Sequence, residues 1–233
     1  MKTTSIAVVF LALSIAPCAM AMPRAPLDSA AKPDFGKATE LAGQELTGEA
    51  RSEAITQIET YLSGIHSIVA DFTQNSADGS SGGGKFFLNR PGKMRWQYNP
   101  PTPILLVSDG KVITYYDAGL DQVTYVGIDD TLAGFLTKKD IKLDSDSIQL
   151  TQLTEENGIL RATVVQRKKP GEGSLTLEFS QKPTEIRRMM AVDATGNETR
   201  VELQKAQFGP VIDDKLFTFD DPRSVNRRRN KRS

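Results

Sequence analysis

The most informative segment of the sequence is Arg90-Pro91-Gly92-Lys93-Met94-Arg95-Trp96-Gln97-Tyr98. Pro-Gly is typical of a tight turn, and after it Met94, Trp96 and Tyr98 alternate with polar residues. A period of two indicates a β-strand with one apolar face. A second turn follows at Ser108-Asp109-Gly110-Lys111, where Asp-Gly is typical of a two-residue type I′ hairpin. It predicts that residues 105–108 pair antiparallel with residues 111–116.

The same alternation extends to both sides of this stretch. Phe86 and Leu88 share a face in the preceding strand, and residues 68–74 and 122–128 are also strand-like. Residues 76–84 contain four glycines and three serines, which predicts a mobile hairpin loop. Four more strands are predicted at 160–166, 175–179, 186–192 and 199–207, with Ile186, Arg188, Met190 and Val192 on one face of the third. About ten strands in an antiparallel meander make the chain mainly β, with a minor helical part.

Two helices complete the prediction. Ile55, Ile58, Leu62 and Ile65 recur at steps of three, four and three, so residues 50–65 form an amphipathic helix. Asp129-Asp130-Thr131 precedes Leu132, Phe135 and Leu136 and predicts a short N-capped helix. A curled sheet must fill its concave apolar face, and two short helices are too few to fill a large barrel. We therefore expect a hydrophobic cavity beneath a helical lid.

The two ends of the chain differ in composition from the middle. Lys2, an apolar run from Ile6 to Ala16 and Ala19-Met20-Ala21 predict a signal peptide over 1–21, cleaved after about Ala21. The only cysteine, Cys18, leaves with it, so no disulfide or thiol chemistry is expected. Residues 22–49 are interpreted as a flexible leader and residues 223–233 as a basic disordered tail. That tail either contacts anionic lipid head groups or an acidic partner, or only keeps the chain in solution.

Residues that carry catalysis are scarce. The single histidine, His66, has no nucleophile or carboxylate motif around it, and no His and carboxylate cluster has metal-ligand spacing. Gly82 to Gly84 lack the Lys-Ser or Lys-Thr of a phosphate loop. The sequence thus predicts a protein that is not an enzyme, with no metal, no cofactor and no nucleic-acid partner.

Several short motifs occur in a specific order over about residues 50–222. After the first helix come Asp71-Phe72-Thr73-Gln74, the Gly-rich loop, the Arg90 to Trp96 stretch and Ser108-Asp109-Gly110-Lys111, then Tyr116, Asp121-Gln122-Val123 and Leu216-Phe217-Thr218-Phe219. In order and spacing this closely resembles the periplasmic outer-membrane lipoprotein carrier family, LolA. The domain expected from the resemblance spans 50–222.

The resemblance implies an unclosed antiparallel β-barrel of about 10–11 strands whose helices cover a hydrophobic cavity. It implies a periplasmic monomer that takes acylated lipoproteins from an inner-membrane ABC lipoprotein exporter and delivers them to an outer-membrane lipoprotein receptor. Arg90 corresponds to the family arginine that holds the lid closed and biases cargo transfer. Acyl-chain contacts are expected from apolar residues of the lid and strands: Ile58, Leu62, Phe72, Phe86, Leu88, Met94, Trp96, Leu132, Phe135 and Met190. The alternative to the carrier function is that of an outer-membrane lipoprotein receptor, or of a lipid-sensing regulator with the same fold.

Overall fold

A computed structural model describes residues 43–223; the predicted signal peptide, most of the leader and the basic tail after Arg223 lie outside the described residues. Within these described residues the chain forms β-strands, two α-helices and three short 3₁₀ segments. In chain order these are β1 (Gln44–Glu45), α1 (Gly48–Gly64), β2 (Ser67–Ser76), β3 (Ser81–Asn89), β4 (Lys93–Tyr98), β5 (Ile104–Asp109), β6 (Val112–Asp117), β7 (Gln122–Gly127), η1 (Ile128–Asp130), α2 (Leu132–Thr137), β8 (Ile148–Glu156), β9 (Ile159–Gln166), η2 (Pro170–Glu172), β10 (Gly173–Gln181), β11 (Thr184–Asp193), β12 (Glu198–Phe208) and η3 (Asp214–Phe217).

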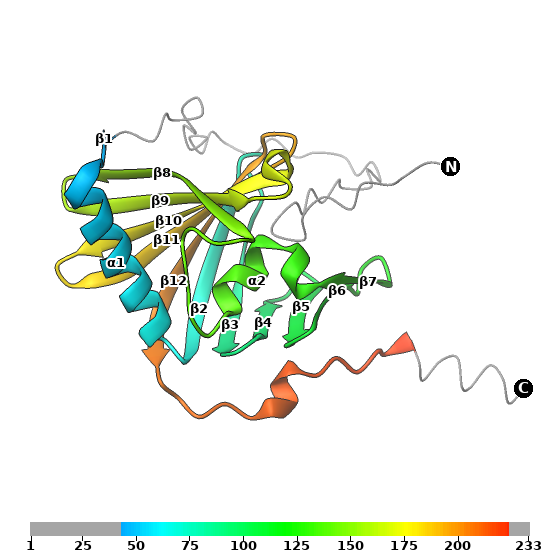
Figure 1. The fold of residues 1–233 in the computed structure, drawn as a ribbon. Coiled ribbons are helices and arrows are strands. Elements are labelled where there is room, and N and C mark those ends of the chain that lie inside the picture. The colour runs from blue at the N-terminus through cyan, green and yellow to red at the C-terminus, as the bar shows by residue number, and fades with distance from the viewer. Residues whose placement is uncertain (1–42, 224–233) are drawn as a thin grey trace, which may run out of the picture.

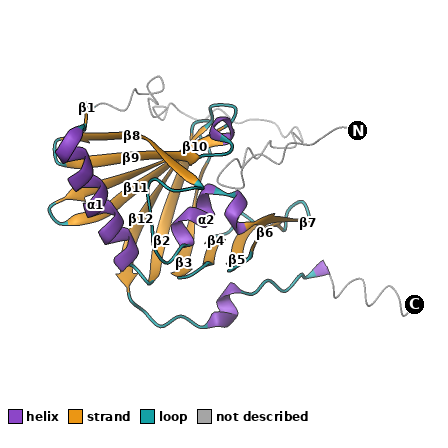
Figure 2. Ribbon diagram, viewed as in Figure 1, coloured by secondary structure: helices purple, strands orange, loops and turns teal. Residues whose placement is uncertain are grey.

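All the described strands join one sheet of 12 strands, in the order β1-β8-β9-β10-β11-β12-β2-β3-β4-β5-β6-β7. Neighbouring strands are antiparallel, and the sheet ends at β1 and β7. The sheet curls, and α1 and α2 both lie on its inner side (Figures 1 and 2). The prediction of a mainly β, unclosed antiparallel barrel is therefore confirmed, with strands beyond the ten read from the sequence.

The extra strands lie where the sequence pattern is weak or interrupted. β8 carries a register shift between Leu150 and Gln152, which breaks its alternation of apolar residues. β1 is two residues long and pairs with the end of β8. Residues 44–45 and 48–49, assigned to the leader from composition, are therefore strand and helix.

The Gly-rich stretch was also misassigned in part. Ser81 to Gly84 belong to β3, so the loop is confined to residues 77–80. A side chain at Gly84 would place its Cβ 2.0 Å from the Gln97 carbonyl oxygen and 2.9 Å from the Phe72 ring. This glycine allows a close approach of neighbouring groups inside the sheet.

Turns at Gly92 and Gly110 hold two hairpins against each other. Both glycines have positive φ, and a Cβ on Gly92 would lie 2.6 Å from Gly110 Cα. The hairpin at Asp109 forms, but Leu105 pairs with Tyr116, two residues beyond the register that a two-residue turn predicts. The Asp109 carboxylate accepts hydrogen bonds from the N–H groups of Lys111 and Val112 at 2.9 and 3.0 Å, which widens the turn. A shift of two residues leaves the inward faces unchanged.

The predicted face of β11 is wrong beyond Ile186. Glu178 of β10 pairs with Arg188, whereas Phe179 pairs with Ile186, so Arg187 is an extra, bulged residue. The bulge reverses the alternation. Met189 is consequently 5% exposed in the core, while Met190 is half-buried and pairs with Arg200 on the other face.

The core lies between the inner face of the sheet and the two helices. Its aromatic centre is formed by Trp96, whose ring lies 4.9 Å from that of Phe72 and 4.2 Å from that of Phe86. From α1, Ile58 and Leu62 are buried against the same cluster, each contributing about 2 kcal/mol by leaving water. Among the described residues, no helix is both long and apolar enough to cross a membrane.

Residues 209–223, the C-terminal strap, run along the opposite, outer face of β4, β5 and β6 (Figure 1). Lys93 Nζ lies 2.8 Å from the Asp214 carboxylate, and Arg95 donates to the Leu216 carbonyl at 3.0 Å. Phe217 is fully buried, and the Phe219 ring lies 5.5 Å from that of Tyr116. The Leu216 to Phe219 motif thus covers the outside of the sheet and does not contact the interior.

Candidate functional site: a latched helix over an apolar interior

Helix α1 is amphipathic and covers the inner face of the sheet. Ala54, Ile58 and Leu62 are buried beneath it, whereas Ser52 and Glu53 face solvent. A buried stripe on one side and polar residues on the other are what a removable cover requires. Helix α1 thus lies where the sequence predicts the lid helix, and its buried side packs directly on the apolar core of the sheet.

Arg90 joins both helices to the sheet. It follows β3, and its Nη1 donates to the Leu62 carbonyl and, at 2.7 Å, to the Ile65 carbonyl, both at the C-terminal end of α1. Its Nε donates to the Leu136 carbonyl of α2 at 3.0 Å. We call this set of contacts the Arg90 latch. Gly92 N–H adds a 2.8 Å bond to the Thr137 carbonyl, so the same turn holds α2 twice.

The latch uses properties specific to arginine. The last carbonyls of a helix lack intrahelical partners and carry partial negative charge, so a cation there is favourable. A planar guanidinium reaches several carbonyls at once, which an ammonium cannot do in the same geometry. Burial lowers the pKa of Arg90 to about 10, which leaves it charged at neutral pH. The cost of removing the guanidinium from water offsets part of the gain from its hydrogen bonds.

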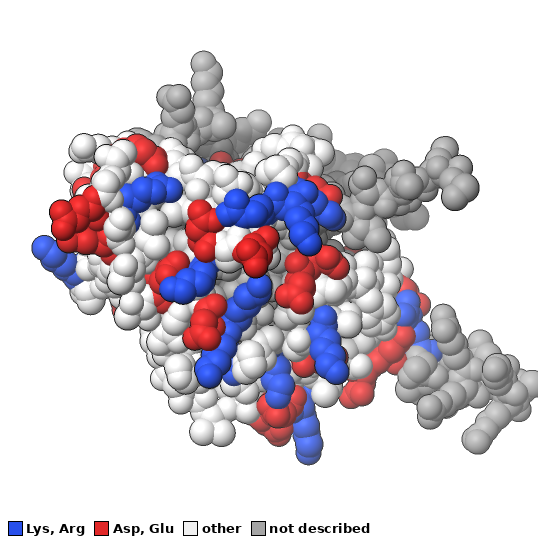
Figure 3. All heavy atoms as spheres, in the orientation of Figure 1, with Lys and Arg blue, Asp and Glu red and all other residues white. Residues whose placement is uncertain are grey.

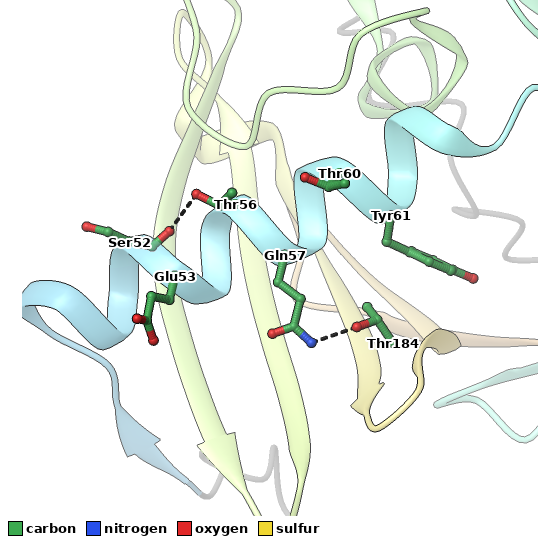
Figure 4. Close-up of a pocket in the computed structure, with 7 residues that line it drawn as sticks. All are labelled: Ser52, Glu53, Thr56, Gln57, Thr60, Tyr61 and Thr184. Carbon is green, nitrogen blue, oxygen red and sulfur yellow. Dashed lines mark hydrogen bonds between the residues drawn. The ribbon is translucent and has the colours of Figure 1, made fainter.

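Further polar contacts fix the two sides of α1. Toward the segment after α2, Glu59 accepts from Leu143 N–H at 2.9 Å and Ser63 accepts from Ile141 N–H at 3.0 Å. Toward β11, Gln57 donates to the Thr184 hydroxyl at 2.6 Å, as Figure 4 shows. Tyr61 accepts from Ile186 N–H at 3.1 Å. Helix α1 is thus held by hydrogen bonds along both edges, by an ion pair between Glu59 and Lys142, and by apolar contact beneath.

The residues predicted to contact acyl chains meet at one place, with one exception. Nine of them are buried and packed together in the core under α1 and α2: Ile58, Leu62, Phe72, Phe86, Leu88, Met94, Trp96, Leu132 and Phe135. Met190 does not join them, and Met189 takes its position. Three further core residues were missed by sequence reasoning. Ile141 and Leu143 lie in the loop after α2, and Leu153 lies in β8 beyond its bulge, so none of them belongs to a clear alternating pattern.

The polar and charged residues elsewhere on the surface form no further candidate site among those described. His66 is exposed at the junction of α1 and β2. Within residues 43–223, no group of three or more His, Cys, Asp or Glu side chains is arranged to hold a metal ion. On the face seen in Figure 3, positive and negative side chains are interspersed.

An open antiparallel sheet curled around an apolar interior, with a helix latched over it by hydrogen bonds, defines a class of lidded half-barrel proteins. Comparison with known families identifies which one. Residues 63–220 match the model described as "Outer membrane lipoprotein carrier protein LolA", and the chain belongs to this family. The resemblance stated from the sequence motifs is therefore confirmed.

Individual relatives agree with the family match. An outer-membrane lipoprotein carrier protein from Pseudomonas paraeruginosa is 29% identical over 79% of this chain and 91% of its own length. One from Chromobacterium violaceum is 27% identical over 84% of this chain and 97% of its own. A solved LolA superfamily protein from Nitrosomonas europaea is 10% identical, covers 71% of this chain and 98% of its own, and has a TM-score of 0.42.

Proposed function

We propose that this protein is a monomeric periplasmic carrier that binds the acyl chains of lipoproteins under α1. It receives them from an inner-membrane ABC exporter and delivers them to an outer-membrane receptor. The observation that carries the proposal is the Arg90 latch, which holds two helix ends over a continuous apolar core. The names of the relatives support the cargo class.

The need for such a carrier follows from the solubility of acyl chains. A chain of about 15 methylenes gains on the order of 12 kcal/mol when it leaves water. In the closed structure the interior is filled by its own side chains, so cargo enters as α1 moves away. Moving α1 away costs the hydrogen bonds at its edges, about 1 kcal/mol each, and the three bonds of the latch, about 1.5–3 kcal/mol each. Together these costs are comparable to the gain from burying one acyl chain, so cargo competes with α1 for the apolar core.

Release of the cargo requires that the closed, cargo-free state of the protein be close in free energy to the cargo-bound state. The latch contributes to this by stabilising the empty, closed form, which lowers the net affinity for cargo to a level the receptor can exceed. Met94 and Met189 lie in the core and are unbranched and flexible, so they can repack around chains of different length. The role of the protein is binding and transfer, without chemistry on the cargo.

The single tryptophan provides a direct test. Trp96 is 4% exposed at the centre of the core, so entry of an acyl chain changes its emission. Mature protein is titrated with a synthetic triacylated lipopeptide and, separately, with the same peptide without acyl chains. We expect saturable change with one lipopeptide per chain, confirmed by native mass spectrometry, and no change with the bare peptide. Failure to bind the acylated peptide refutes the proposal.

The transfer step is tested with variants of two comparable arginines. Arg90→Leu removes the latch, whereas Arg95→Leu removes an arginine bonded to a carbonyl of the C-terminal strap on the outer face. We expect Arg90→Leu to bind lipopeptide but to pass it to purified receptor more slowly, and Arg95→Leu to pass it at the wild-type rate. Wild-type transfer by Arg90→Leu contradicts the assigned role.

A further inference from the structure

Strands β11 and β12 are neighbours in the sheet but pair over only part of their length. Their ladder runs from Val192 and Glu198 to Arg188 and Glu202, and among the described residues it goes no further. Beyond this point residues 184–186 pair with β10 alone, and residues 203–208 pair with β2 alone. The two strands diverge on the side covered by α1 (Figure 1). We call this gap, between residues 184–187 and 203–208, the seam.

Two bulges cause the divergence. Arg187 is the extra residue of β11, and in β12 the register shifts between Gln204 and Gln207, with Lys205 at a φ of 52°. A bulge bends its strand and interrupts the ladder. The first bulge adjoins the last paired residue of β11, and the second begins two residues beyond the last paired residue of β12, so the seam is built into the backbone.

The seam contains a hollow of about 440 Å³. Ile186, Leu203 and Ala206 line it and also pack against the core, while Phe208, at its outer end, is 47% exposed. Three apolar side chains that pack against the core therefore form the floor of a hollow whose remaining lining is largely polar. Charged side chains surround its mouth: Glu185, Arg187, Arg188, Glu202 and Lys205.

Tyr61 of α1 lies at the inner side of the seam. Its hydroxyl accepts from Ile186 N–H at 3.1 Å, and its ring lies 6.1 Å from that of Phe179, edge to face. A second hollow of about 630 Å³, between α1 and the start of β11, is lined by Tyr61 and Thr184 (Figure 4). The first hollow is lined by Ile186 and the second by Tyr61, and these two residues are joined by the hydrogen bond just described.

We propose that the seam is a lateral port through which an acyl chain of the cargo enters and leaves the interior, an inference that rests on the proposed carrier function. The alkyl chain lies along Ile186, Leu203 and Phe208, and the polar peptide of the lipoprotein stays at the charged mouth. Along this path each methylene passes from one apolar contact to the next, so the whole chain is never exposed to water at once.

Cross-linking locates the path. The photoreactive residue p-benzoylphenylalanine is placed at position 187, at the mouth of the seam, or at position 142, an exposed site whose lysine bonds Glu59 on the other side of α1. Each protein is loaded with triacylated lipopeptide and irradiated, and mass spectrometry identifies adducts on the acyl chains. The port predicts adducts at position 187. Adducts at position 142 alone overturn it.

Loading kinetics provide an independent readout. Phe208→Arg places a charge on the proposed path, and Val211→Arg places one at a fully exposed residue outside the seam. We expect Phe208→Arg to slow both association and dissociation of lipopeptide about tenfold, with little change in Kd, because a charge beside an alkyl chain raises the barrier and not the bound state. Equal rates for the two variants refute the port. If wild type binds no lipopeptide, it is the carrier function that fails.

Discussion

Replacement of Arg90 by leucine tests the latch most directly, because one side chain supplies three contacts. Arg90 donates to the carbonyls of Leu62, Ile65 and Leu136, and charge-assisted bonds of this kind contribute about 1.5–3 kcal/mol each. Two terms reduce the total. Leu62 O keeps a 3.3 Å bond from Ile65 N–H, and the variant no longer desolvates a guanidinium. We expect the closed position of α1 to lose about 2–4 kcal/mol.

Native-state hydrogen exchange measures this loss. Opening of α1 becomes about 30- to 700-fold more frequent, so amides of residues 54–64 lose that much protection while those of β9 and β10 are unchanged. Arg90→Lys restores part of the protection, because an ammonium reaches fewer carbonyls. Arg95→Leu serves as the control and leaves α1 as in wild type. Protection of α1 that is equal in Arg90→Leu and Arg95→Leu shows that the latch does not hold the lid.

Three further predictions concern stability. Burial, together with nearby Asp117, raises the pKa of Tyr115 to about 12. The contribution of this side chain to the free energy of unfolding is therefore complete below the ordinary tyrosine pKa of 10.0 and is lost as pH rises toward 12. Urea unfolding at a series of pH values should show a shallower alkaline decline in stability for Tyr115→Phe than for wild type, and an identical decline counts against this assignment. The added methyl group of Gly92→Ala clashes with the adjacent hairpin, whereas Gly110→Ala suffers only an unfavourable φ. The first variant should therefore lose at least about 1 kcal/mol more of its free energy of unfolding than the second, as measured in urea. The reverse order contradicts the packing of the two turns. Phe217→Ala should cost about 3–5 kcal/mol by the same measurement, because this ring of the strap is fully buried. A cost below about 1 kcal/mol, as expected for an exposed residue, is incompatible with that burial.

Much of the fold is predictable from local pattern. Alternation around Trp96 and the Pro-Gly and Asp-Gly turns define strands whose neighbours follow directly in the chain, and hairpin geometry then dictates antiparallel pairing. The spacing of Ile58 and Leu62 identifies the lid in the same way. These signals are strong because each depends only on residues close in sequence.

The errors in which face a side chain occupies share one physical origin, which is the β-bulge. Arg187 and the shift after Leu150 each insert a residue that has no opposite partner. Alternation read through such a point assigns every later side chain to the wrong face, and this is how Met190 was chosen in place of Met189. The assignment of Gly84 to a loop failed for a different reason. Close packing against Phe72 requires a glycine, and glycine is also typical of a flexible loop.

The carbonyl groups to which Arg90 donates could not be identified from the sequence. An arginine before Pro-Gly is common at the end of a strand, and nothing local shows that helix ends distant in the chain converge on it. The family resemblance pointed to the residue, and the structure supplied the carbonyls.

The order of the strands has a consequence for how the molecule assembles. The sheet consists of two meanders, β2 to β7 and β8 to β12, and the joint between them is the pairing of β2 with β12. Nascent chains emerge amino-terminus first, so β2 waits with a bare edge until nearly all the polypeptide has been made. Truncation before β12 leaves that edge open to intermolecular pairing, and such fragments should aggregate instead of persisting as a smaller folded unit.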